Sequence, residues 1–87
     1  MSVTPDEVLA VLQQAVATVL ELDPSSVTRE TRLREDLAAD SLALVEIVEM
    51  VEEALAPRAQ SSFHIDDEDL DSLTTVGEAV DYALARL

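Results

Sequence analysis

Residues 36–46 of the chain read DLAADSLALVE, and this stretch joins a charged segment to a long apolar-striped helix. Asp40 is a residue type that caps helix N-termini, so Ser41 takes the first helical position. The Ser41 side chain would then lie beside unpaired N–H groups and the positive end of the helix dipole. Because such a place stabilises anions, the pattern favours a phosphate ester on Ser41.

Three amphipathic helices and one short helical turn surround this stretch. Apolar residues recur at helical spacing, and capping boxes begin at Thr4 and Thr75. The patterns predict a first helix to about Leu22, a second from Ser41 to about Ala56, a single turn within 66–72, and a last helix after Thr75. These elements favour a small all-α bundle.

Two further features of this bundle can be predicted. A connection as long as residues 24–39 is expected to be held to the core by buried apolar side chains. Its spaced apolar residues are Val27, Leu33 and Leu37. Helical spacing gives the second helix a buried stripe, with candidates Val45, Ile47 or Val48, Val51 and Leu55.

Composition narrows the class of protein. The chain has 87 residues, a size that suits one domain over residues 1–87, and its 2% aromatic content predicts an aliphatic core. A net charge of −14 disfavours nucleic acid and anionic membranes and favours partners with basic patches. The chain has no cysteine, no long apolar run and no basic leader, so we expect a cytoplasmic monomer. The start at Met1 suggests a free-standing protein, with an excised domain as the alternative.

Self-contained catalysis and metal binding are disfavoured. Ser41 lacks the Gly-x-Ser-x-Gly elbow of hydrolases, and the only histidine, His64, has no pattern that pairs it with Ser41. Asp67-x-Asp69-x-Asp71 with Glu78 approaches an EF-hand loop, but Ser72 stands where that loop needs glycine. We therefore expect no catalytic residue and no specific metal site.

The motif Asp40-Ser41-Leu42, preceded by residues 36–39 and followed by Glu46, resembles the attachment motif of acyl carrier proteins. The order of helices resembles that family along nearly the whole chain. The resemblance implies that Ser41, flanked by Asp40 and Leu42, bears 4′-phosphopantetheine. It also implies a phosphopantetheinyl transferase that uses coenzyme A and magnesium, and thioester-bound intermediates passed to enzymes such as a ketosynthase and an acyltransferase.

Acidic residues of the second helix form a candidate docking face for such enzymes. Residues 46, 49 and 53 share one side of a helix at 100° per residue. By resemblance, the partner-facing acids fall on Glu46, Glu52 and Glu53, and Asp36 lies near the attachment site. Glu49 departs from the family, which often has an apolar residue at this place. The docking candidates are Asp36, Glu46, Glu49, Glu52 and Glu53.

An acyl chain carried on the arm would need an aliphatic pocket between the helices. The candidates lie near the start of the second helix or in facing segments: Leu44, Val45, Val48, Ile65 and Val76. Ordinary core packing is the alternative for each of them.

The resemblance leaves two biosynthetic pathways as alternatives. Residues 40–46 resemble discrete carriers of iterative polyketide synthases, which favours polyketide or antibiotic biosynthesis. Residues 74–82 resemble the carriers of fatty acid synthesis to the same degree, which favours fatty acid biosynthesis. Ala38 and Asp66 stand where the family usually has glycine and proline. An acidic adaptor without a cofactor is the alternative from another class.

Overall fold

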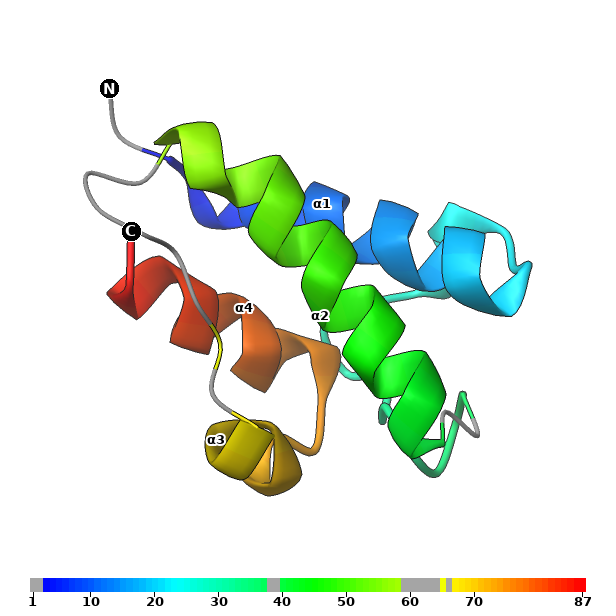
Figure 1. Cartoon of the computed structure of the whole chain (residues 1–87). Coiled ribbons are helices and arrows are strands. Elements are labelled where there is room, and N and C mark those ends of the chain that lie inside the picture. The colour runs from blue at the N-terminus through cyan, green and yellow to red at the C-terminus, as the bar shows by residue number, and fades with distance from the viewer. Residues whose placement is uncertain (1–2, 38–39, 59–64, 66) are drawn as a thin grey trace.

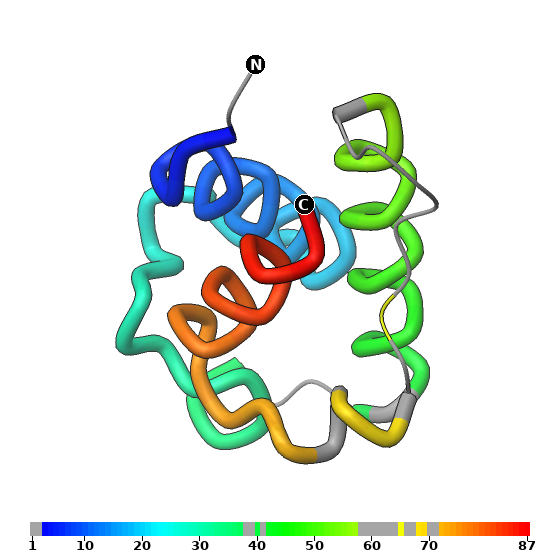
Figure 2. Tube along the Cα trace, turned by 90° about the vertical axis from the view of Figure 1, so that its left-hand side faces the viewer, coloured from blue at the N-terminus to red at the C-terminus, as the bar shows by residue number. Residues whose placement is uncertain are grey.

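The computed structural model describes residues 3–37, 40–58, 65 and 67–87, which form a helical bundle (Figure 1). Its elements are α1 (Pro5–Leu20), η1 (Pro24–Ser26), α2 (Ser41–Leu55), η2 (Ala56–Arg58), α3 (Asp67–Ser72) and α4 (Val76–Ala85). In both general views, α3 and the start of α2 lie at the end of the bundle away from the two chain termini (Figures 1 and 2). The predicted bundle of three main helices and one short helix is confirmed, with its long connection between α1 and α2.

Side-chain caps begin the helices where the sequence predicts them. The Glu7 N–H donates to Thr4 Oγ1 at 3.2 Å, and the Glu78 N–H donates to Thr75 Oγ1 at 3.1 Å. Each bond satisfies a backbone donor that has no partner within its own helix. The predicted starts of α1 and α4 are therefore confirmed by their capping geometry.

The end of α1 differs from the prediction. The helix ends at Leu20 instead of Leu22, because Glu21 adopts a left-handed backbone conformation with φ of 57°. The N–H groups of Glu21 and Leu22 both bond the carbonyl of Ala17 and close the last turn. Glycine normally signals such an ending, and its absence here left proline as the only marker in the sequence.

The connection between α1 and α2 is pinned to the bundle as expected. Val27 and Leu33 are buried, and Leu37 is half-buried. An antiparallel bridge also joins Arg32 to Thr75, the residue before α4. The segment runs along the side of the bundle opposite α2 (Figure 2).

Gly77 allows this connection to lie close to α4. Its N–H donates to the carbonyl of Arg29 at 2.9 Å. A side-chain carbon at this position would stand 3.0 Å from that same oxygen, which is closer than ordinary van der Waals contact. The lack of a side chain at residue 77 therefore permits the approach.

The core is aliphatic, as the composition predicts. α1 approaches both α2 and α4 closely, whereas α2 and α4 do not approach each other within the part of the chain that the structure describes. The buried stripe of α2 consists of Leu44, Ile47, Val51 and Leu55. Val45, which we expected in this stripe, is 40% exposed because it lies 100° around the helix from Leu44.

A polar cluster joins α3 to α4. Asp69 Oδ2 accepts from the Tyr82 hydroxyl at 2.5 Å and from the Arg86 guanidinium at 3.0 Å. The guanidinium carbon of Arg86 lies 4.2 Å from the centre of the Tyr82 ring. The hydroxyl of Tyr82, and then Arg86, lower the pKa of Asp69 because both stabilise its charged form.

This cluster makes stability depend on pH in one direction. Because the folded-state pKa of Asp69 is lowered, its contribution is present above its unfolded pKa, about 3.9, and is lost as the pH falls through the lower folded value. Asp69→Asn should therefore lower the melting temperature at pH 7, and its difference from the unsubstituted chain should vanish in acid. Thermal unfolding at a series of pH values measures this difference.

Glu68→Gln is the matched control, because it removes the same charge from the same helix at an exposed position. Removing one charge from a chain of net charge −14 should itself weaken repulsion, and the control accounts for that effect. Equal melting temperatures for the two variants at pH 7 would contradict a role for the cluster.

Candidate functional site

Ser41 is the first residue of α2, and Asp40 is its cap. Asp40 Oδ1 accepts from the N–H of Ala43 at 2.8 Å, and the Asp40 carbonyl accepts from the N–H of Leu44 at 3.0 Å. Helix geometry leaves the N–H groups of Ser41 and Leu42 without partners within the helix. The predicted cap and the predicted first helical position are both confirmed.

Apolar side chains are exposed around the start of α2. Leu42 is 67% exposed and Val45 is 40% exposed, and their spacing of three residues places them on neighbouring parts of one face. Exposed apolar side chains are common singly, but a pair beside a helix start offers a contact surface. A macromolecule that reaches Ser41 would meet both.

The acids of α2 divide into an exposed set and a half-buried one. Glu46, Glu49 and Glu53 are exposed, and α2 contains neither lysine nor arginine that could pair with them. We refer to these three residues as the acidic face. Glu52 is half-buried, and its Oε2 accepts from the backbone N–H of Ile65 at 3.0 Å. Glu52, which we expected among the docking acids, thus makes an internal contact.

Asp36 also makes an internal contact, although it is exposed. Its Oδ2 accepts from the N–H of Arg32 at 2.9 Å, and its own N–H donates to the Arg32 carbonyl at 3.0 Å. These bonds close the turn ahead of α2. Asp36 therefore shapes the connection that leads to Ser41.

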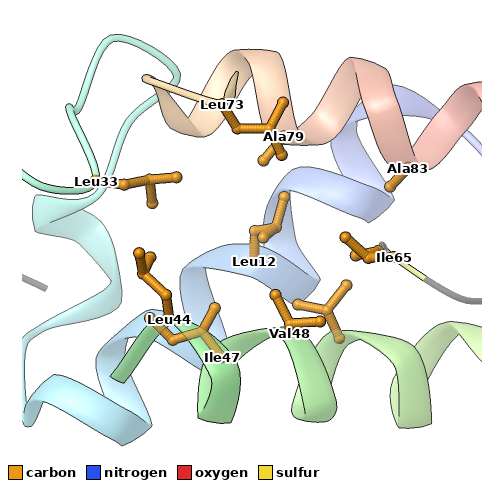
Figure 3. A pocket seen from close by; sticks show the side chains of 10 residues that line it. Leu12, Leu33, Leu44, Ile47, Val48, Ile65, Leu73, Ala79 and Ala83 are labelled. Carbon is orange, nitrogen blue, oxygen red and sulfur yellow. The ribbon is translucent and has the colours of Figure 1, made fainter. Parts of the chain in front are cut away.

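A small apolar cavity lies between α2 and α4, where the two helices stand apart. Its volume is about 20 Å³, and its walls are aliphatic side chains from α1, α2, α4 and the connections between helices (Figure 3). Leu12 of α1 lies at its centre in this view, with residues of α2 on one side and Ala79 and Ala83 of α4 on the other. The residues that line it are Leu12, Leu33, Leu44, Ile47, Val48, Val51, Ile65, Leu73, Ala79 and Ala83.

Only some of the residues that the sequence suggested for an acyl pocket line the cavity. Leu44, Val48 and Ile65 line the cavity. Val45 is exposed on α2, and Val76 is fully buried at the start of α4 without lining the cavity. Sequence reasoning placed several other wall residues in the core without assigning them to a cavity. The signal for Ile47 and Val51 was their spacing of three and seven residues from Leu44.

Two expectations fall outside the described residues. His64 and the departures from the family pattern at Ala38 and Asp66 all lie there.

In the part of the chain that the structure describes, no group of His, Cys, Asp or Glu side chains could hold a metal ion. No described helix has both the length and the apolar character that a transmembrane segment requires.

The residues present fit a phosphate-linked arm attached at residue 41. The start of α2 offers backbone N–H groups and the positive end of the helix dipole to a phosphodiester. The chain supplies no thiol of its own, and an aliphatic cavity lies behind the start of the same helix. Such an arm would contribute a terminal thiol, on which an acyl group is carried as a thioester.

Comparisons with known proteins agree with this geometry. The family model described as "Phosphopantetheine attachment site" matches residues 10–83. An acyl carrier protein of Rubrobacter xylanophilus is 44% identical over 79 residues, which cover 91% of this chain and 90% of that protein. A meromycolate extension acyl carrier protein of Mycolicibacterium smegmatis is 38% identical over 82 residues, covering 94% and 77% of the two chains.

A solved structure shows the same fold. The acyl carrier protein of Enterococcus faecalis matches with a TM-score of 0.73 and 29% identity, over 98% of this chain and 100% of that one. The match of the family model and the identity of the relatives together decide the family. The chain belongs to the acyl carrier proteins, non-catalytic carriers whose cofactor is a covalently attached 4′-phosphopantetheine.

Proposed function

We propose that Ser41 is the attachment residue for 4′-phosphopantetheine. The observation that carries this proposal is the position of Ser41 at the start of α2, directly after its cap Asp40 and inside the family match. A transferase would join the Ser41 oxygen to the phosphorus of the phosphopantetheine. The bond from that phosphorus to the nucleotide part of coenzyme A would break. The nucleotide part would be released, together with the proton of the Ser41 hydroxyl.

The aliphatic cavity is the proposed site for part of the carried chain. Leu44, Val48 and Ile65 support this assignment, because they line the cavity from α2 and from the segment before α3. An engineered cavity that binds benzene measures roughly 150 Å³, so a cavity of about 20 Å³ must widen before it takes an acyl chain. The carried chain would therefore enter by displacing a wall.

The acidic face is the proposed docking surface for partner enzymes. Glu46, Glu49 and Glu53 are exposed along the helix that begins at Ser41. Partners with basic patches, including the transferase, a ketosynthase and an acyltransferase, would be steered toward this helix. Such attraction speeds association without requiring a long-lived complex, which suits a carrier that visits several enzymes.

We further propose that residues 1–87 form a single carrier domain that is monomeric and cytoplasmic. The radius of gyration is 11.7 Å, close to the value of about 12 Å expected for one compact domain of this length. The net charge of −14 opposes self-association.

The proposed pathway is polyketide biosynthesis, which the sequence of residues 40–46 supports. Fatty acid biosynthesis is the second candidate. Residues 74–82 favour it, and so do the aliphatic walls of the cavity, which suit a saturated chain better than a polar polyketide. Relatives named for meromycolate extension are consistent with an acyl chain of that second kind.

The test begins with the unloaded protein, coenzyme A, Mg²⁺ and a broad-specificity phosphopantetheinyl transferase. Intact mass spectrometry should show one added 4′-phosphopantetheine. The loaded protein, charged with a malonyl group, is then offered to a polyketide ketosynthase and to a fatty acid ketosynthase. Faster condensation with the polyketide enzyme supports the first pathway, and faster condensation with the fatty acid enzyme overturns it.

A further inference from the structure

We propose that a polar cleft beside the start of α2 binds the free carboxylate of a short acyl unit carried on Ser41, such as a malonyl group. The inference rests on the proposed carrier function and adds a binding site to it. The cleft has a volume of about 220 Å³ and adjoins the apolar cavity, because Leu73 lines both. The described residues that line it are Arg32, Arg34, Glu35, Leu73 and Thr74.

The cleft lies at the end of the bundle where Ser41 stands. Leu33, which separates the two arginines in the chain, lies with Leu44 at one end of the apolar cavity (Figure 3). Leu44 belongs to the first turn of α2, three residues after Ser41. The opposite wall of the cleft, residues 73–74, directly follows α3, which lies at the same end of the bundle as the start of α2 (Figures 1 and 2). An arm attached to Ser41 would therefore begin close to the cleft.

The charge of the cleft suits an anion. Two of the five basic residues of the chain line it, and the acid among its described wall residues is Glu35. The Arg32 Nη1 group donates to Glu35 Oε2 at 2.6 Å. Because a guanidinium has five N–H donors, Arg32 keeps donors for a second carboxylate. Asp36 lies nearby without lining the cleft, and its Oδ2 accepts from the backbone N–H of Arg32. In a chain of net charge −14, this lining offers a carboxylate two cations against one anion.

Backbone hydrogen bonds fix the two sides of the cleft to each other. The Leu33 N–H donates to the Thr74 carbonyl at 2.9 Å, and the Val76 N–H donates to the Thr31 carbonyl at 2.9 Å. An engineered cavity of roughly 150 Å³ holds benzene, so a cleft of about 220 Å³ takes a short acyl unit without displacing a wall. The apolar cavity, at about 20 Å³, does not. A short unit with a carboxylate would therefore lie in the cleft, with charge-assisted hydrogen bonds from the two arginines.

Nuclear magnetic resonance of the loaded chain tests this site, with attachment checked by intact mass. A malonyl arm should move the side-chain Nε–H resonance of Arg34 and the amide resonance of Thr74 relative to a propionyl arm, which has a methyl group in place of the carboxylate. Arg34→Gln should reduce the movement at Thr74 about threefold or more, because a charge-assisted hydrogen bond is lost. Arg29→Gln is the matched control. It removes the same charge from an exposed arginine of the same connection, outside the cleft, and should leave the movement unchanged.

Monomethyl malonate tests the cleft without an arm. In the unloaded chain this anion, at about 10 mM or more to match the effective concentration that a tether provides, should move the same two resonances. The uncharged dimethyl ester at equal ionic strength should not move them. Failure to attach the arm would count against the proposed function alone, and this titration would then decide whether the cleft binds a carboxylate.

Three results would overturn the proposal. The first is an equal effect of the malonyl and propionyl arms, and the second is a movement at Thr74 that survives Arg34→Gln. The third is a response to free monomethyl malonate with none to the malonyl arm, because the cleft would then take an anion that the arm does not bring.

Discussion

Ser41→Ala is expected to abolish attachment of 4′-phosphopantetheine completely while the helical bundle persists. The substitution removes the oxygen that would bond to phosphorus, and nothing else in the side chain can replace it. Alanine is a good helix former, so α2 should still begin after Asp40. Intact mass after incubation with the transferase and coenzyme A measures attachment, and far-ultraviolet circular dichroism measures the helical content.

Two control variants separate the acceptor from its surroundings. Ser72→Ala removes another serine at a helix end and should load fully. Asp40→Ala removes the cap, which should cost about 1 kcal/mol of stability, and the protein should still load, though more slowly. An adduct on Ser41→Ala would contradict the assignment of Ser41, and loss of attachment in Ser72→Ala would point to a different acceptor.

The features that were predicted correctly from the sequence are those that depend on residues close together in the chain. Asp40 and Thr75 are capping residues, and each caps the helix that the sequence assigned to it. The burial of Val27 and Leu33 could be predicted because isolated apolar residues hold a long polar connection in place only when they pack into the core. These signals depend only on neighbours in the chain.

The features that were missed depend on contacts between distant segments. The bridge between Arg32 and Thr75 is made by backbone groups, which every residue carries. No residue type in the sequence therefore predicts it. Glu52 was assigned outward with the other acids of α2, yet its contact lies 13 residues away at Ile65. A position at the border between the polar and apolar sides of a helix leaves both assignments open until its neighbour is known.

Reversing Glu46 and Glu53 to arginine should lower the kcat/KM of the phosphopantetheinyl transferase by about tenfold to a hundredfold at low ionic strength. The two residues are exposed and seven positions apart, so they lie on the same side of α2. Neither side chain makes a hydrogen bond or an ion pair within the part of the chain that the structure describes, so the fold should persist. The rate of arm transfer at limiting carrier concentration gives kcat/KM.

The position of the charges, and not their sum, should account for this loss. Reversing Asp6 and Glu30 changes the net charge equally, and both residues are exposed and lie outside α2. This control should reduce kcat/KM far less. The difference between the two variants should shrink as salt is added, because the Debye length falls to about 3 Å at 1 M. Equal losses for both pairs would mean that the partner responds only to overall charge, and the acidic face would then not be the docking surface.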